Sequence, residues 1–114
     1  MSRKASAAER LSAAAPVFAA LGDETRLSLV GRLCHEGPQS ISRLSEGSAV
    51  TRQAITKHLT LLASVGLVHD SRQGRERIFE LAPKRLEQAQ RCLAEISTQW
   101  DAAIERLKAF VEDQ

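Results

Sequence analysis

The segment from Thr51 to Ser64 contains the residues whose types and spacing suggest chemistry. Ile55, Leu59 and Leu62 recur at the spacing of one helix face, and polar side chains share the opposite face. Those polar residues are Arg52, Gln53, Thr56, Lys57 and Thr60. In the major groove, Arg and Gln donate paired hydrogen bonds to purines, Thr offers a hydroxyl and a methyl group, and Lys supplies a charge for guanine or phosphate. The pattern therefore predicts a helix that reads DNA.

An ordinary surface helix is the alternative, because amphipathic segments are common. Thr51 favours the DNA-binding interpretation, since as an N-cap it starts the helix just before its first polar residues. A recognition helix uses its N-terminal end to enter the groove. The segments on either side of 51–64 decide between the two interpretations.

Two helices are predicted before the segment 51–64, and a short connection joins the second of them to it. Asp23 is expected to cap a helix over 24–36, whose predicted stop is Gly37 followed by Pro38. Its apolar residues are expected to form one buried face: Leu27, Val30, Leu33 and Cys34. Ser40 is expected to cap a third, short helix with Ile41 and Leu44 buried. Two helices joined by a tight turn of small residues, the second with a free polar face, are typical of a helix-turn-helix.

Residues 1–8 are small and polar and include no evident helix cap, so we expect them to be disordered. From about Glu9 an amphipathic helix is expected, which Pro16 would delay or kink. Leu11 and Phe18 lie on its apolar face, and Gly22 would end it.

Over residues 67–81 the apolar residues alternate with polar ones, as they do in strands. The runs LVHDS and RIFEL flank RQGRE, where Gly74 supplies a hairpin turn and Phe79 with Leu81 point inward. The hairpin tip is basic, with Arg72, Gln73, Arg75 and Arg77. Beside a recognition helix, such a tip could reach a flanking phosphate or the minor groove. The plainer alternative is a solvated hairpin whose arginines keep its edge soluble.

A long final helix is predicted from Pro83 almost to the end of the chain. Apolar residues repeat every seven positions in two series: Leu86, Leu93, Trp100, Leu107 and Ala89, Ile96, Ala103, Phe110. At 1.5 Å per residue, a helix over 84–111 would be roughly 42 Å long, more than a small domain can cover. We expect this seam to form a homodimer, with the first helix packing across it. The alternative is that the helix folds back entirely on its own domain.

Composition limits the classes of protein that fit. The 114 residues suit one domain, with 9–82 as the DNA-binding part and 83–114 as its dimerisation helix. The formal net charge is only +2, but it is +3 over residues 49–77 and −2 over 78–114. Neither a signal peptide nor a membrane span is recognised, and two cysteines suit a reducing cytoplasm. Few aromatic residues favour duplex DNA over single strands.

Three strings, ALGDETRLSLV, TRQAITKHLTLLASVGLV and GRERIFEL, together resemble the ArsR/SmtB family of repressors. The resemblance covers about residues 17–82 in motif. It implies a mainly α winged helix-turn-helix, in the order of four helices, a small β-hairpin wing and a long C-terminal dimerisation helix. It also implies that Arg52, Gln53, Thr56 and Lys57 enter the major groove, that Thr51 and His58 are positioned on phosphate, and that the wing arginines bind the flanks.

The departures from the family bear on what the protein could sense. Metal-sensing members carry a Cys-x-Cys before the recognition helix, where this chain has Ser40 and Ser42, and serine does not replace thiolate as a ligand. Other members use Asp and His on the last helix, but no histidine follows His69. We therefore expect no metal site and no cofactor. Some relatives join a cysteine of the second helix to one of the last, so Cys34 and Cys92 leave a redox switch as an alternative.

These observations predict a homodimeric repressor that binds a palindromic, double-stranded operator in the cytoplasm. A second alternative is a protein-interaction module that keeps the winged helix only as a scaffold. An enzyme is not expected, because the chain shows no phosphate loop and no nucleophile grouping. Asp101 and Glu105, the nearest approach to a carboxylate pair, suit the solvent side of the last helix.

Overall fold

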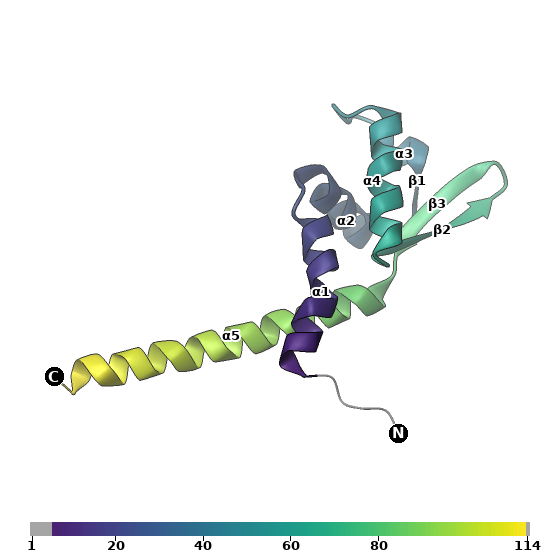
Figure 1. Cartoon of the computed structure of the whole chain (residues 1–114). Coiled ribbons are helices and arrows are strands. Elements are labelled where there is room, and N and C mark those ends of the chain that lie inside the picture. The colour runs from purple at the N-terminus through teal and green to yellow at the C-terminus, as the bar shows by residue number, and fades with distance from the viewer. Residues whose placement is uncertain (1–5, 114) are drawn as a thin grey trace, which may run out of the picture.

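The computed structural model describes residues 6–113, which form a mainly helical fold with one small antiparallel sheet. The elements are α1 (Ala7–Leu21), α2 (Glu24–Glu36), β1 (Gln39–Ser40), α3 (Ile41–Ser45), α4 (Arg52–Ser64), β2 (Val68–Gln73), β3 (Glu76–Leu81) and α5 (Pro83–Glu112). Figure 1 shows a helical body from which the β2–β3 hairpin projects on one side, while α5 runs away on the other. This is the predicted winged helix-turn-helix with a long last helix.

Four helices begin at a side-chain cap that accepts a backbone hydrogen bond from three residues further on. Asp23, Ser40 and Thr51 cap α2, α3 and α4 as predicted. Ser6 also caps α1, which begins at Ala7 rather than near Glu9. The expectation of disorder over 1–8 is therefore wrong for residues 7 and 8, while residues 1–5 lie outside the described part.

Pro16 lies inside α1 without ending it. The proline lacks one backbone donor, but it is exposed, and the helix buries Ala14, Val17 and Ala20 on its other side. Packing of that face maintains one continuous helix from Ala7 to Leu21.

The sheet has the order β1-β3-β2, with β3 in the centre. The hairpin register runs from Val68 opposite Leu81 to Gln73 opposite Glu76, and Gly74 adopts a φ of 64° at the turn. The sequence predicted these two strands but not β1, which pairs Gln39 with Phe79. A two-residue strand shows no alternation, so no periodicity could reveal it.

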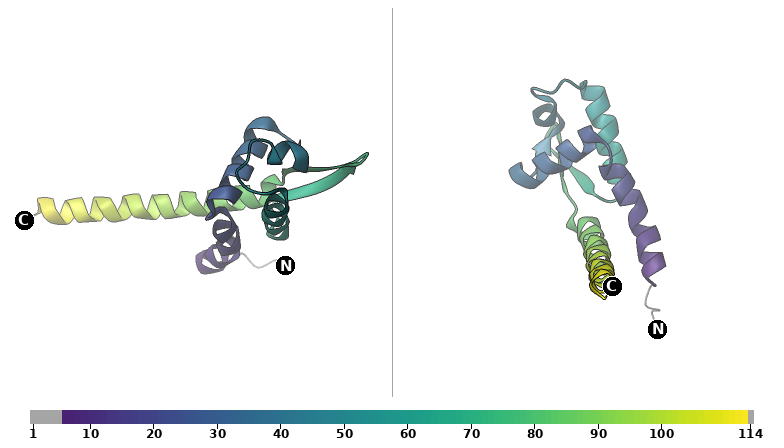
Figure 2. Two further views of the ribbon diagram at one scale, coloured as in Figure 1. Left: turned by 90° about the horizontal axis from the view of Figure 1, so that it is seen from above. Right: turned by 90° about the vertical axis from the view of Figure 1, so that its left-hand side faces the viewer.

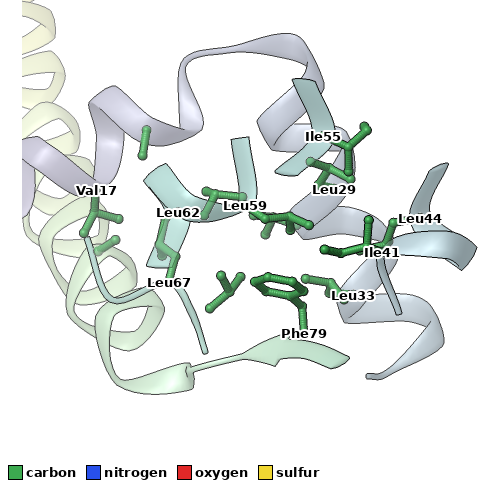
Figure 3. Close-up of a cluster of buried hydrophobic side chains, with 14 residues drawn as sticks. Val17, Leu29, Leu33, Ile41, Leu44, Ile55, Leu59, Leu62, Leu67 and Phe79 are labelled. Atoms are coloured by element: carbon green, nitrogen blue, oxygen red, sulfur yellow. The ribbon is translucent and has the colours of Figure 1, made fainter. Parts of the chain in front are cut away.

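The core lies between the helices and the sheet (Figure 3). Phe79 points from β3 toward the helices, and its neighbour two residues on, Leu81, packs at the edge of the same cluster, as predicted. The largest fully buried side chains are Leu44, Ile55, Leu59, Leu62, Leu67 and Phe79. At about 1.5 to 3 kcal/mol for each buried side chain, this cluster holds α4 in place from behind.

The buried face of α2 differs from the predicted one. Leu29, Val30 and Leu33 are buried, whereas Leu27 is 55% exposed and Cys34 is also exposed. The two stripes overlap on the helix surface, and the spacing of apolar residues alone did not distinguish them.

Helix α1 packs on the N-terminal half of α5, where Ala89 and Cys92 are buried. Arg10 and Glu95 join the two helices through an ion pair of 2.9 Å. The C-terminal half of α5 extends beyond α1 and the rest of the body (Figure 2). The chain therefore spans 67 Å along its longest axis, which leaves this half of α5 without intramolecular cover.

Candidate DNA-binding surface

The polar face of α4 is available for binding. Arg52, Gln53 and Lys57 are exposed, and their side chains have no hydrogen-bond or ion-pair partner among residues 6–113. The hydroxyls of Thr56 and Thr60 donate to main-chain carbonyls one turn earlier, at 3.0 and 2.9 Å. Arg, Gln and Lys have long side chains whose donors can reach base edges and phosphates, and on α4 these donors have no partner among the described residues.

Thr51 lies at the end of α4 that would enter a groove first, and its side chain is used within the helix. Its Oγ1 accepts the backbone N–H of Ala54 at 3.1 Å. The hydroxyl thereby satisfies one of the free donors of the first turn, and the orientation of Arg52 and Gln53 follows from that helix start.

The short helix α3 is held against α2 by an arginine that sequence reasoning did not single out. Arg32 on α2 donates to the carbonyls of Leu44 at 3.0 Å and Arg43 at 3.2 Å, at the C-terminal end of α3. The Arg43 carbonyl also accepts from the backbone N–H of Glu46 at 3.3 Å, and Arg32 supplies a second donor there, so its guanidinium fixes the end of α3 against α2.

His58 lies on the other side of α4 from the polar face. Its Nδ1 is 3.3 Å from Nη1 of Arg26 and 3.9 Å from Oδ2 of Asp23, and its side chain is 24% exposed. Sequence reasoning grouped His58 with the DNA contacts. Its placement sets it apart from the polar face, because at 100° per residue it points away from Thr56 and Thr60 and toward α2, and its contact with phosphate stays a prediction.

Asp23 is the negative group of this cluster. The pKa of its carboxyl lies below the ordinary range, chiefly because the backbone N–H of Arg26 donates to it, with further lowering by the charge of Arg26. An ionised cap suits the N-terminus of α2, where the helix dipole is positive.

The wing carries three arginines, of which two are free. Arg72 and Arg75 are exposed beside the turn at Gly74 and have no partner among the described residues. Arg77 donates from Nε to Oδ2 of Asp70 at 2.6 Å and lies 5.0 Å above the ring centre of Phe79. This hydrogen bond lowers the pKa of Asp70. Arg72 and Arg75 are therefore the unpaired arginines of the wing among the described residues.

The predicted dimer seam divides into two parts. Phe18 and Leu86 are half-buried against the protein's own core, so they serve the fold of the single chain. Ala103 is half-buried on α5. The other predicted seam residues are exposed, at 45% for Leu11, 53% for Leu93, 44% for Ile96, 68% for Trp100, 62% for Leu107 and 64% for Phe110.

The cysteines lie in different environments. Cys34 is exposed on α2, against the expectation that it would be buried, while Cys92 is buried under α1. Over residues 6–113, no group of three or more His, Cys, Asp and Glu side chains could hold a metal ion. No helix in the same range is long and apolar enough to cross a membrane.

Known proteins are similar to this chain in sequence and in fold. A family model described as a helix-turn-helix domain matches residues 21–70. The HTH-type transcriptional regulator Rv2034 of Mycobacterium tuberculosis is 39% identical over 67 residues, which is 59% of this chain and 62% of that regulator. The match thus spans less than two thirds of the relative's length.

Solved structures extend the likeness over most of the chain. An ArsR-like transcriptional regulator from Rhodococcus sp. RHA1 superposes with a TM-score of 0.73 at 37% identity, covering 88% of this chain and 93% of that one. A homodimeric winged helix-turn-helix DNA-binding domain from Mycobacterium bovis, a possible ArsR-family regulator, shares the fold. Its TM-score is 0.62 at 24% identity, with 89% and 91% of the two chains covered.

Proposed function

The chain belongs to the ArsR family of winged helix-turn-helix transcriptional regulators, and from this we propose that it is a homodimeric repressor of an inverted-repeat operator. The observation that carries the proposal is the polar face of α4, whose long donors Arg52, Gln53 and Lys57 are exposed and unpaired among the described residues. Repression would follow where the operator overlaps a promoter.

In this proposal each part of the surface has its own task. Arg52 and Gln53 bind base edges from the first turn of α4, and Lys57 binds guanine or phosphate. Thr51 sets the start of the helix through its cap to Ala54. Thr56 contributes its methyl group to the same face. The wing binds the flanking backbone through Arg72 and Arg75, with Arg77 held by Asp70 behind them.

The dimer is proposed from the apolar side chains that α5 leaves uncovered. Trp100, Leu107 and Phe110 are each more than 60% exposed in the single chain. Soluble proteins seldom expose a stripe of this kind, and a second copy would bury it at about 1.5 to 3 kcal/mol for each large side chain. The homodimeric state of the M. bovis domain with the same fold is consistent with this. A twofold axis at α5 would then place two α4 helices about one turn of DNA apart.

We also infer that the repressor does not respond to metal. Ser40 and Ser42 replace the thiolate pair of metal-sensing members, and Ser40 is engaged as the cap of α3, where its hydroxyl accepts from Arg43 N–H at 3.1 Å. Release of DNA would require an organic or protein effector that prefers a dimer with a different spacing of the α4 helices.

Titration of duplex DNA from its own upstream region by fluorescence anisotropy tests the proposal. We expect tight, salt-dependent binding that neither zinc nor an oxidant abolishes. Release on oxidation would favour the redox alternative, in which Cys34 pairs with Cys92. Failure to bind duplex DNA even at low salt would overturn the proposal in favour of a protein-interaction module.

A further inference from the structure

Arg26 connects three elements that lie apart in the sequence. Its Nε donates to the carbonyl of Ala20 near the end of α1 at 2.7 Å, and its backbone N–H donates to Asp23, the cap of α2. Its Nη1 is 3.3 Å from Nδ1 of His58 on α4. One half-buried guanidinium thus joins the end of α1 to the recognition helix.

The contact with His58 defines the state of the imidazole. Arginine has donors only, so Nδ1 of His58 must accept and cannot carry a proton while the hydrogen bond exists. The ring is then neutral, with its proton on Nε2. Asp23, 3.9 Å from the same Nδ1, is the other charged group that faces the ring.

Because of the position of His58 on α4, this contact bears on the orientation of the helix. Successive residues turn by about 100°, so His58 lies roughly 160° away from Thr56 on the helix surface. Leu59 and Leu62 anchor α4 to the core through apolar contacts, which restrict both its depth and its rotation. A directional hydrogen bond to the back of the helix restricts rotation as well.

We propose that Arg26 is a positioning residue for DNA binding, which fixes the orientation of α4 relative to α1 through its hydrogen bond to His58. Because α1 packs on α5, and α5 carries the seam of the proposed dimer, this contact relates the recognition helix to the dimer axis. The inference rests on the proposed function, in which two α4 helices must match the spacing of an inverted repeat.

The spacing of half-sites provides a readout that fold stability alone would not change. An operator is first selected from random duplex DNA with the wild-type protein, and a second duplex is made with two base pairs inserted between its half-sites. For the wild type we expect a large loss of affinity on insertion. Arg26→Met should lower affinity for the selected operator and shrink that loss by about tenfold, because a loosened α4 tolerates altered spacing.

Two variants control for loss of folding. Arg32→Met removes another half-buried α2 guanidinium, which donates to carbonyls of α3 and touches neither α1 nor α4 through a hydrogen bond. It should leave the spacing ratio within about twofold of the wild type. If Arg26→Met does not fold, His58→Leu replaces it, and His58→Asn should restore the ratio because its amide oxygen occupies the position of Nδ1.

The tautomer supplies an independent measurement. Neutral imidazoles in water favour Nε2–H without excluding Nδ1–H, so in 15N spectra at pH 8 we expect His58 to carry its proton on Nε2 alone, whereas exposed His35 shows a mixture of both tautomers. Arg26→Met should return His58 to a mixture of tautomers like that of His35. An unchanged spacing ratio in a folded Arg26→Met protein would reduce Arg26 to a merely structural role. Failure to select any operator would instead overturn the proposed function, and a His58 proton on Nδ1 would by itself overturn the positioning hydrogen bond.

Discussion

Asp70 and Arg77 face each other diagonally across the two strands of the wing, where Nε of Arg77 donates to Oδ2 of Asp70 at 2.6 Å. The same guanidinium lies over the ring of Phe79, the central residue of the core. Arg77 thereby ties the wing to the body, whereas Arg72 and Arg75 beside the turn have no such partner among residues 6–113.

This difference predicts unequal effects of the wing arginines on DNA binding. Arg75→Ala should weaken binding to all duplex sequences and lower the slope of log affinity against log salt by about 0.9, the value for one phosphate contact. Arg77→Ala should change the slope less, since Asp70 already compensates its charge. Equal slopes for the two variants in salt titrations by fluorescence anisotropy would contradict this division.

The same pair predicts how stability depends on pH. Because the hydrogen bond from Arg77 holds the pKa of Asp70 below its ordinary value of 3.8, the ionised carboxyl stabilises the folded state above that value. This contribution is lost as the pH falls through the lowered pKa. Asp70→Asn should therefore have a lower melting temperature than the wild type at pH 7, and the difference should shrink below pH 3.8. A difference that stays constant down to acid pH would exclude the ion pair as its cause.

Much of the fold could be predicted because its helix starts and turns depend on local chemistry. Asp23, Ser40 and Thr51 each cap the helix that begins at the following residue, and each side chain accepts a hydrogen bond from the backbone N–H three residues further on. Gly74 supplies the positive φ of the hairpin turn. Such features are written in a few adjacent residues. The heptad spacing likewise identified α5 almost to the residue.

What the sequence could not provide was the set of contacts between distant residues. The contacts of Arg26 with His58, and of Arg32 with the end of α3, join positions whose spacing follows no period. Burial was also misjudged where two stripes overlap on one helix, as for Cys34. For the candidate site, residue types identified the free face of α4, but only the structure distinguishes Arg77 and His58, which have partners, from Arg75, which has none among the described residues.

Arg52 and Gln53 lie in the first turn of α4, where we expect base contacts. Arg52→Ala or Gln53→Ala should reduce discrimination at defined base pairs of a selected operator by about 1 to 3 kcal/mol, and change affinity for non-specific duplex less. Competition binding against a set of single-base variants measures this. Should Arg52→Ala lower affinity uniformly across the set, α4 does not enter the groove by its N-terminal end.

Phe79 provides a test of the core behind the recognition helix. Its side chain is fully buried between the sheet and the helices, so Phe79→Ala should lower the free energy of unfolding by about 3 to 5 kcal/mol. Urea denaturation followed by circular dichroism measures the change. Ile78→Ala, at the half-buried neighbouring position on the other side of the strand, serves as the control and should cost clearly less.

Trp100 offers the sharpest test of the proposed dimer, because it is 68% exposed in the single chain and so contributes little to the fold of one protomer. If a second copy covers this ring, Trp100→Ala removes a large apolar contact from the interface. Dimerisation should weaken by about 2 kcal/mol or more for each buried ring, and each 2 kcal/mol raises the dissociation constant roughly 30-fold. Sedimentation velocity over a concentration series measures that constant. Thr98→Ala, on the opposite side of the same helix turn, should leave it unchanged. DNA affinity should fall together with the dimer fraction in Trp100→Ala and recover at protein concentrations that restore the dimer, because the α4 face is intact. A Trp100→Ala protein that sediments as the wild type does at every concentration would show that the exposed face of α5 is not where the two copies meet.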